Sequence, residues 1–169
     1  MEGRIKGPEM HRSLPTIATL LGIAGLIPFV ACSFGALSLA GEDAARALLA
    51  LIAYAAVILA FLGGVHWGFG LDASGTAPAN VQRDRFGLGV VPSLVGWAAL
   101  LLAFFGLPRT GLALLAAGFI GITVLEARAS RAGWMPKGYM GLRWVLSAIV
   151  IVLLVSVWLV LVLGGRVIL

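Results

Sequence analysis

Five long apolar stretches alternate along the chain with short segments that contain most of the charged residues. A helix needs about 20 mainly apolar residues to cross the hydrocarbon core of a bilayer. All stretches but the fourth reach that length, and the fourth reaches it if the arginines that follow it extend toward the headgroups. The pattern predicts an all-α membrane protein, a five-helix bundle with spans at about 14–39, 46–69, 87–105, 111–128 and 143–163.

The segments between the spans contain residues that end helices. Gly41 is expected to end the first helix, and the acidic pair 42–43 then suits the N-terminus of the second. The turn at 106–111 predicts an antiparallel pair from the third and fourth helices. We expect a loop over 71–86 and an interfacial segment over 129–143. The transmembrane domain then covers 14–163, between a basic tail at 1–13 and a short tail at 164–169.

The distribution of lysine and arginine predicts the orientation. Three of the 12 basic residues lie in the N-terminal tail, two precede the third span, and four precede the fifth. The other three lie in the alternate segments. Because basic loops stay in the cytoplasm, the N-terminus is expected inside and the C-terminus outside.

Composition excludes several classes of function. The chain is 61% hydrophobic and only 11% charged, and its net charge of +5 comes from residues scattered between apolar stretches. A nucleic-acid partner is therefore not expected, whereas a lipid bilayer is. Two histidines and one cysteine cannot form a zinc site without carboxylates. The sequence predicts no metal site and no catalytic residue.

A candidate polar site lies near the cytoplasmic ends of the central helices. His66 is a titratable group one turn inside the end of an apolar span, where a polar side chain needs a partner. The expected topology brings Glu126 and Ser93 to a similar depth, with Arg83 and Arg85 beside them. These five residues would form a cytoplasmic-facing pocket. A structural role for His66 and Glu126 is the alternative, because groups this close to the interface can reach water.

Small residues recur every four positions in the second span, at Ala56, Ala60, Gly64 and Gly68. Such a stripe allows another helix to approach closely, because packing rather than water expulsion drives helix association in lipid. His66 lies about 200° around the helix from Gly64. The stripe either packs inside the bundle or binds a partner.

Three motifs resemble those of a known family: FLGGVHWG (61–68), VVPSLVGW (90–97) and LGIAGLIPF (21–29). On these motifs the chain resembles the transmembrane-protein-69-like family, a membrane domain of unknown function in bacteria and mitochondria. The resemblance implies a five-helix protein of the bacterial inner membrane and brings no established activity. Trp67, Pro92 and Trp97 match the family pattern, as do His66 and Ser93.

Two main functions remain open. The sequence favours a non-catalytic subunit or assembly factor that packs against a larger membrane complex or a second copy of itself. The alternative is a small membrane enzyme or carrier for a lipid or an anionic metabolite, with its site around His66 and Glu126. A third option is ligation of a haem or a pigment by His66.

Overall fold

The computed structural model describes residues 16–71, 79–131 and 139–164. Every secondary-structure element in these ranges is an α-helix, which confirms the predicted all-α class. The helices are α1 (Thr16–Ala24), α2 (Leu26–Ser38), α3 (Gly41–Leu71), α4 (Ala79–Phe104), α5 (Pro108–Arg131) and α6 (Tyr139–Val162).

Five helical segments of the described chain are long enough to cross a membrane, when α1 and α2 are counted as one. Four stretches are both long and apolar enough: Thr16–Ser38 (α1 and α2 together), Gly41–Gly68 of α3, all of α5, and Met140–Val162 of α6. The apolar part of α4 is shorter, at Gly89–Phe104. Helix α4 nevertheless has 26 residues. At 1.5 Å per residue it extends about 39 Å, more than the core of a bilayer.

The first span is divided at Gly25 into α1 and α2. Pro28 lies in the first turn of α2 and has no N–H with which to bond the carbonyl of Ala24. The hydroxyl of Tyr54 on α3 donates a hydrogen bond of 3.0 Å to the carbonyl of Gly25. A side chain of α3 thus satisfies a backbone group at the break, as helix interruptions in lipid require.

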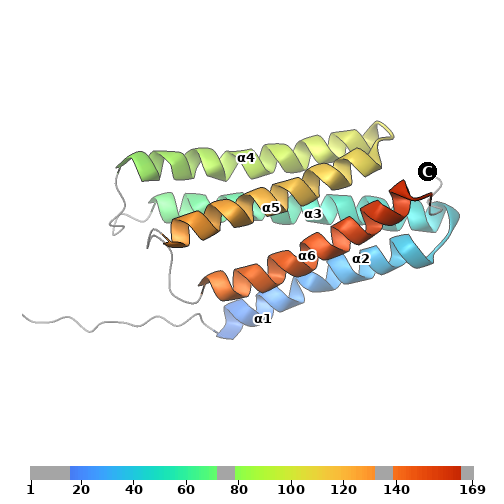
Figure 1. The fold of residues 1–169 in the computed structure, drawn as a ribbon, viewed down its shortest axis with the longest axis horizontal. Helices are drawn as coiled ribbons and strands as arrows, with labels where there is room; N and C mark the ends of the chain where they lie inside the picture. The colour runs from blue at the N-terminus through green and yellow to red at the C-terminus, as the bar shows by residue number, and fades with distance from the viewer. Residues whose placement is uncertain (1–15, 72–78, 132–138, 165–169) are drawn as a thin grey trace, which may run out of the picture.

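The helices run antiparallel in chain order, and Figure 1 shows that α1, α4 and α6 begin at the same end of the bundle at which α3 and α5 finish. Helix α3 is central and packs against α2, α4 and α5, while α6 packs against α5, α2 and α1. Helix α1 contacts α2 and α6, and none of its Cα atoms comes within 8 Å of a Cα atom of α3. At the end of the bundle where α1 begins, the backbone of the first span is therefore not in direct contact with α3.

At the opposite end, a glycine joins α4 to α5. Gly106 has a φ of +77°. The N–H of Leu107 donates a hydrogen bond of 2.8 Å to the carbonyl of Leu102, and the N–H of Gly106 donates one of 3.1 Å to the carbonyl of Ala103. This pair of bonds is a Schellman motif, which needs a left-handed residue and so favours glycine. Pro108 then begins α5 at a position that needs no amide donor. The predicted antiparallel turn is present.

Helices α3 and α4 approach each other through glycines. A Cβ atom added at Gly63 would overlap the carbonyl oxygen of Gly89, and one added at Gly96 would lie 2.9 Å from the carbonyl oxygen of Ala56. Because glycine has no side chain, the two backbones can come this close. The contact continues from α4 to α5, where a Cβ at Gly111 would lie 2.8 Å from the carbonyl oxygen of Ala99.

The helices extend beyond the apolar stretches that predicted them. The prediction of a loop over 71–86 is wrong from residue 79 onward, because α4 begins at Ala79. Residues 72–78 lie outside the described residues. The interfacial segment expected over 129–143 is likewise helical at its two ends, up to Arg131 and from Tyr139. Hydropathy detects the lipid-facing part of a helix, whereas hydrogen bonding continues through polar residues at the membrane surface.

Candidate functional site

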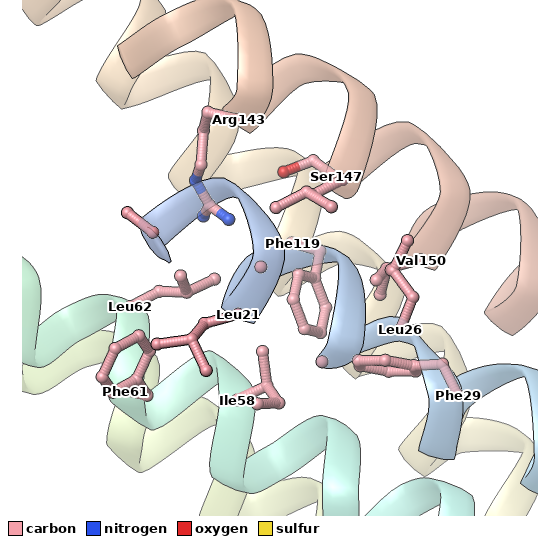
Figure 2. Close-up of a pocket in the computed structure, with 14 residues that line it drawn as sticks. Leu21, Leu26, Phe29, Ile58, Phe61, Leu62, Phe119, Arg143, Ser147 and Val150 are labelled. Carbon is pink, nitrogen blue, oxygen red and sulfur yellow. The ribbon is translucent and has the colours of Figure 1, made fainter. Parts of the chain in front are cut away.

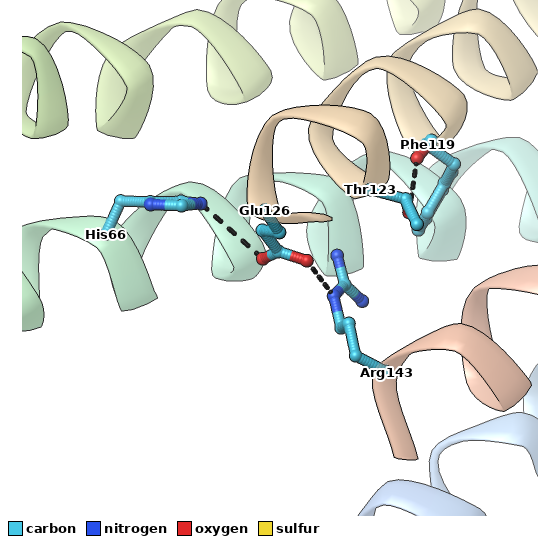
Figure 3. A network of polar contacts seen from close by, with 5 residues as sticks. All are labelled: His66, Phe119, Thr123, Glu126 and Arg143. Atoms are coloured by element: carbon cyan, nitrogen blue, oxygen red, sulfur yellow. Dashed lines mark hydrogen bonds and ion pairs between the residues drawn. The ribbon is translucent and has the colours of Figure 1, made fainter. Parts of the chain in front are cut away.

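A buried row of three ionisable side chains joins α3, α5 and α6, as Figure 3 shows. The Nε of Arg143 donates a hydrogen bond of 2.5 Å to Oε2 of Glu126. On the other side of the carboxylate, Nε2 of His66 lies 3.5 Å from Oε1. The exposed fractions are 3% for His66, 0% for Glu126 and 7% for Arg143. Glu126 is therefore the centre of a polar network inside the bundle.

The antiparallel topology brings these residues to one level. His66 and Glu126 lie close to the ends of α3 and α5, and Arg143 lies near the start of α6. All three helix ends are on the same side of the bundle (Figure 1). Isolated charges at this position would be costly to remove from water. Pairing Glu126 with Arg143 offsets both charges, and the contact couples the two helices.

Some polar atoms near this network have no partner within the described part of the chain. They include Nη2 of Arg143 and Oγ of Ser147, which are buried and make no hydrogen bond there. The contact of His66 with Glu126 has an ion-pair distance and does not have hydrogen-bond geometry. By contrast, the hydroxyl of Thr123 on α5 donates to the carbonyl of Phe119 at 2.8 Å.

The predicted polar pocket is only partly assembled. His66 and Glu126 are in contact, but Ser93 is exposed on α4. Arg83 and Arg85 belong to α4, and their side chains lie outside the described residues. Sequence reasoning missed Arg143, because we assigned it to the segment before the fifth span. Its spacing of four residues from Ser147 on the same helix face could have indicated an inward-facing pair.

The residues of the family motifs occupy the contact between α3 and α4. The indole N–H of Trp67 donates to the carbonyl of Phe86 at 3.1 Å, and the two rings pack edge to face at 5.5 Å. A Cβ at Gly89 would overlap the ring of Trp67. Pro92 is buried inside α4, next to Gly63. Trp97 is exposed on α4.

The stripe of small residues divides into two parts. Ala56 is buried against Gly96 of α4, and Ala60 is half-buried. Gly64 and Gly68 are exposed, and a Cβ added at either would meet no atom within 4 Å. The glycine that packs inside the bundle at this level is Gly63. The stripe therefore changes from an internal contact to an outer surface along α3.

Two arrangements of the described residues bear on the binding of a metal ion and on the binding of a haem or pigment by His66. In the described ranges no three His, Cys, Asp or Glu residues come together in a way that could hold a metal ion. The Nε2 atom of His66 faces Glu126, so ligation through that nitrogen would replace this contact.

Comparison with known proteins places the chain in a family. Residues 14–159 match the family model described as a protein of unknown function, DUF3429. A stretch of 66 residues is 41% identical to Transmembrane protein 69 of Xenopus tropicalis and covers 39% of this chain and 26% of the relative. The match thus spans about a quarter of the relative's length. No solved structure matches the chain. The family model covers most of the chain and confirms the resemblance seen in its motifs: the chain belongs to the DUF3429 family of membrane proteins of unknown function.

Proposed function

We propose that this protein is a non-catalytic subunit or assembly factor that packs against another integral membrane protein. The observation that carries the proposal is the exposed pair Gly64 and Gly68 on α3. Nothing in the described structure lies within 4 Å of a Cβ at either position. In lipid, two glycines four residues apart form a surface on which another helix can pack closely.

Within the described residues, glycine at these two positions makes no close contact with another helix. Each glycine in a helix interior costs about 1 kcal/mol relative to alanine. At Gly63 that cost is offset by the close approach of α4, which a larger residue would prevent. At Gly64 and Gly68 the described chain offers no such contact, and a partner helix would supply one.

The polar network supports a non-catalytic role. Glu126 is engaged by Arg143 and faced by His66, in a position removed from solvent. The hydrogen-bonded ion pair of Glu126 with Arg143 joins α5 to α6, and His66 contributes an ion-pair contact from α3. The alternative function, an enzyme or carrier using His66 and Glu126, requires that His66→Ala abolish a cellular phenotype at unchanged protein abundance. Haem or pigment ligation by His66 would give the purified protein a visible absorption band.

We place the protein in the bacterial inner membrane with its N-terminus in the cytoplasm. The positively charged end of the chain supports this orientation. Arg46, near the opposite end, is paired with Glu42 at 2.6 Å and lies 3.6 Å from Asp43, so its charge is largely offset. By sequence, nine of the 12 basic residues lie in the segments on the N-terminal side, as the positive-inside rule requires.

The test compares substitutions at two exposed glycines. Gly64→Leu blocks the proposed contact, and Gly121→Leu on α5 is the matched control, because a Cβ there also meets nothing within 4 Å. Tagged variants are extracted gently from native membranes and weighed by native mass spectrometry. We expect the wild type and Gly121→Leu to retain a second protein that Gly64→Leu loses at least tenfold. Equal retention by both variants, or a mass of the chain alone in the wild type, would contradict the proposal.

A further inference from the structure

A cavity of about 400 Å³ lies between the first span and the rest of the bundle. Figure 2 shows its wall, to which α1, α2, α3, α5 and α6 all contribute. Apolar side chains make up most of the wall: Leu21, Leu26, Phe29, Ile58, Phe61, Leu62, Phe119, Leu146 and Val150. Two polar side chains, those of Arg143 and Ser147, lie together at one end of the cavity.

The polar end offers unused hydrogen-bond donors. Arg143 is 7% exposed and Ser147 is 2% exposed, and both line the cavity. Nη2 of Arg143 and Oγ of Ser147 have no hydrogen-bond partner within the described part of the chain. Unpaired buried donors are rare, because their loss of water is not compensated. Both donors are thus available to an acceptor atom at this end of the cavity.

The cavity borders the outer face of the bundle at α1 and α3. Helices α1 and α3 both line it, although none of the Cα atoms of α1 comes within 8 Å of one of α3. Leu21 on α1 and Phe61 on α3 are each 65% exposed. The gap therefore lies between two apolar helix faces, in the part of the bundle that the bilayer surrounds. A ligand would enter from the membrane through this gap.

The charges at the site favour an uncharged ligand head. The carboxylate of Glu126 already offsets Arg143 through the bond to Nε. An anionic head would add a second negative charge beside that of Glu126, and within the described residues the other ionisable group of the network is His66. A carbonyl oxygen needs no such compensation and can accept hydrogen bonds from both Nη2 and Oγ.

We propose that this cavity binds an uncharged membrane amphiphile, whose carbonyl oxygen accepts hydrogen bonds from Arg143 and Ser147 while its apolar body occupies the rest of the cavity. The volume is sufficient for the head and the adjoining ring or acyl segment, since a cavity of roughly 150 Å³ holds benzene. A longer chain continues between α1 and α3 into the bilayer. The carbonyl comes from an acyl ester or from a quinone ring, and the observations at Arg143 and Ser147 that carry this proposal do not depend on the proposed partner contact at Gly64.

The test uses a photoreactive lipid and the complete chain in micelles of dodecyl maltoside, a detergent that has no carbonyl group. The probe is a diacylglycerol with a diazirine on one acyl chain, and the labelled residues are mapped by mass spectrometry. We expect labelling of Phe119, which is only 1% exposed but lines the cavity. A lipid on the outside of the bundle would label Phe34, which is 70% exposed, and labelling confined to such residues would overturn the proposal.

Two pairs of variants separate the site from general lipid contact. Ala18→Phe fills the cavity, and Ala31→Phe adds the same ring on an exposed face of the first span. We expect the first to reduce labelling of Phe119 at least fivefold and the second to leave it unchanged. Ser147→Ala should weaken binding about two- to tenfold, the equivalent of one hydrogen bond. Ser156→Ala on the same helix, whose hydroxyl bonds the carbonyl of Val152, should not.

Two more arms test the chemistry of the head. A photoreactive phosphatidic acid with the same chains should label Phe119 less than the diacylglycerol does, and stronger labelling would overturn the assignment of an uncharged head. Unlabelled diacylglycerol and unlabelled decyl-quinone then compete with the probe. Competition by either supports the site and identifies the source of the carbonyl, whereas competition by neither would overturn it.

Discussion

Arg143 and Glu126 form an ion pair of 2.5 Å that joins α6 to α5 inside the bundle. Both side chains are buried, and His66 of α3 faces the other oxygen of the same carboxylate. The free energy of folding is therefore expected to depend strongly on this pairing. Removing Glu126 leaves the buried guanidinium of Arg143 without this carboxylate, which is costly.

We therefore expect Glu126→Gln to lower the free energy of unfolding by about 3–5 kcal/mol. The double variant with Arg143→Gln should lose less than the sum of the single losses, because no buried guanidinium then remains without its carboxylate. Denaturant unfolding in detergent measures these differences. Glu42→Gln is the control, since the pair of Glu42 with Arg46 is exposed and its loss should have no measurable effect. Additive losses in the double variant would show that the two residues act separately.

His66→Ala should be milder than Glu126→Gln. Glu126 keeps its hydrogen bond to Arg143 when the imidazole is removed, so no charge is left unpaired. We expect a loss of roughly 1–3 kcal/mol, the range for one buried polar contact together with lost packing. Protein abundance in membranes and unfolding in detergent should decline together. A larger loss than that of Glu126→Gln would show that His66, rather than Glu126, is the centre of the network.

Two adjacent glycines of α3 should respond oppositely to alanine. Gly63→Ala places a methyl group against the carbonyl of Gly89, and we expect a loss of about 1–3 kcal/mol from forced separation of α3 and α4. Gly64→Ala adds the same methyl group in open space, where the higher helix propensity of alanine should stabilise the chain by up to about 1 kcal/mol. Unfolding curves of the two variants give the comparison. Equal losses would contradict the observed orientation of α3.

The break between α1 and α2 should depend on one hydroxyl. Tyr54→Phe keeps the ring, which packs edge to face on Phe29 at 5.0 Å, and removes the hydrogen bond to Gly25. We expect a loss of about 0.5–1.5 kcal/mol. Amide exchange near residue 25 should rise in the variant. Unchanged exchange would show that the break is stable without this contact.

The helical bundle could be predicted from the sequence because the bilayer core offers the backbone no water with which to form hydrogen bonds. Each backbone group must be satisfied within its own helix, so the apolar stretches give the number of helices and their antiparallel order. The same reasoning failed where charged residues turn inward. Arg143 adjoins a basic segment and gives no hydropathy signal of burial, yet it is the partner of Glu126.

The finer contacts depend on rotations that sequence does not fix. Gly63 and Gly64 are neighbours, and only the rotation of α3 decides that the former packs on Gly89 while the latter faces outward. The cavity was not predictable either. It depends on the distance between α1 and α3, which is set by the packing of α1 on α6 and by the break at Gly25.

The most direct test of the proposed function is photo-cross-linking in native membranes from Val57, which is exposed and two helical turns before Gly64 on the same face. A photoreactive amino acid at position 57 is compared with one at Ile120, an exposed position on α5. We expect a second polypeptide cross-linked from position 57 and none from position 120. Adducts with lipid alone from both positions would contradict a role in binding another membrane protein.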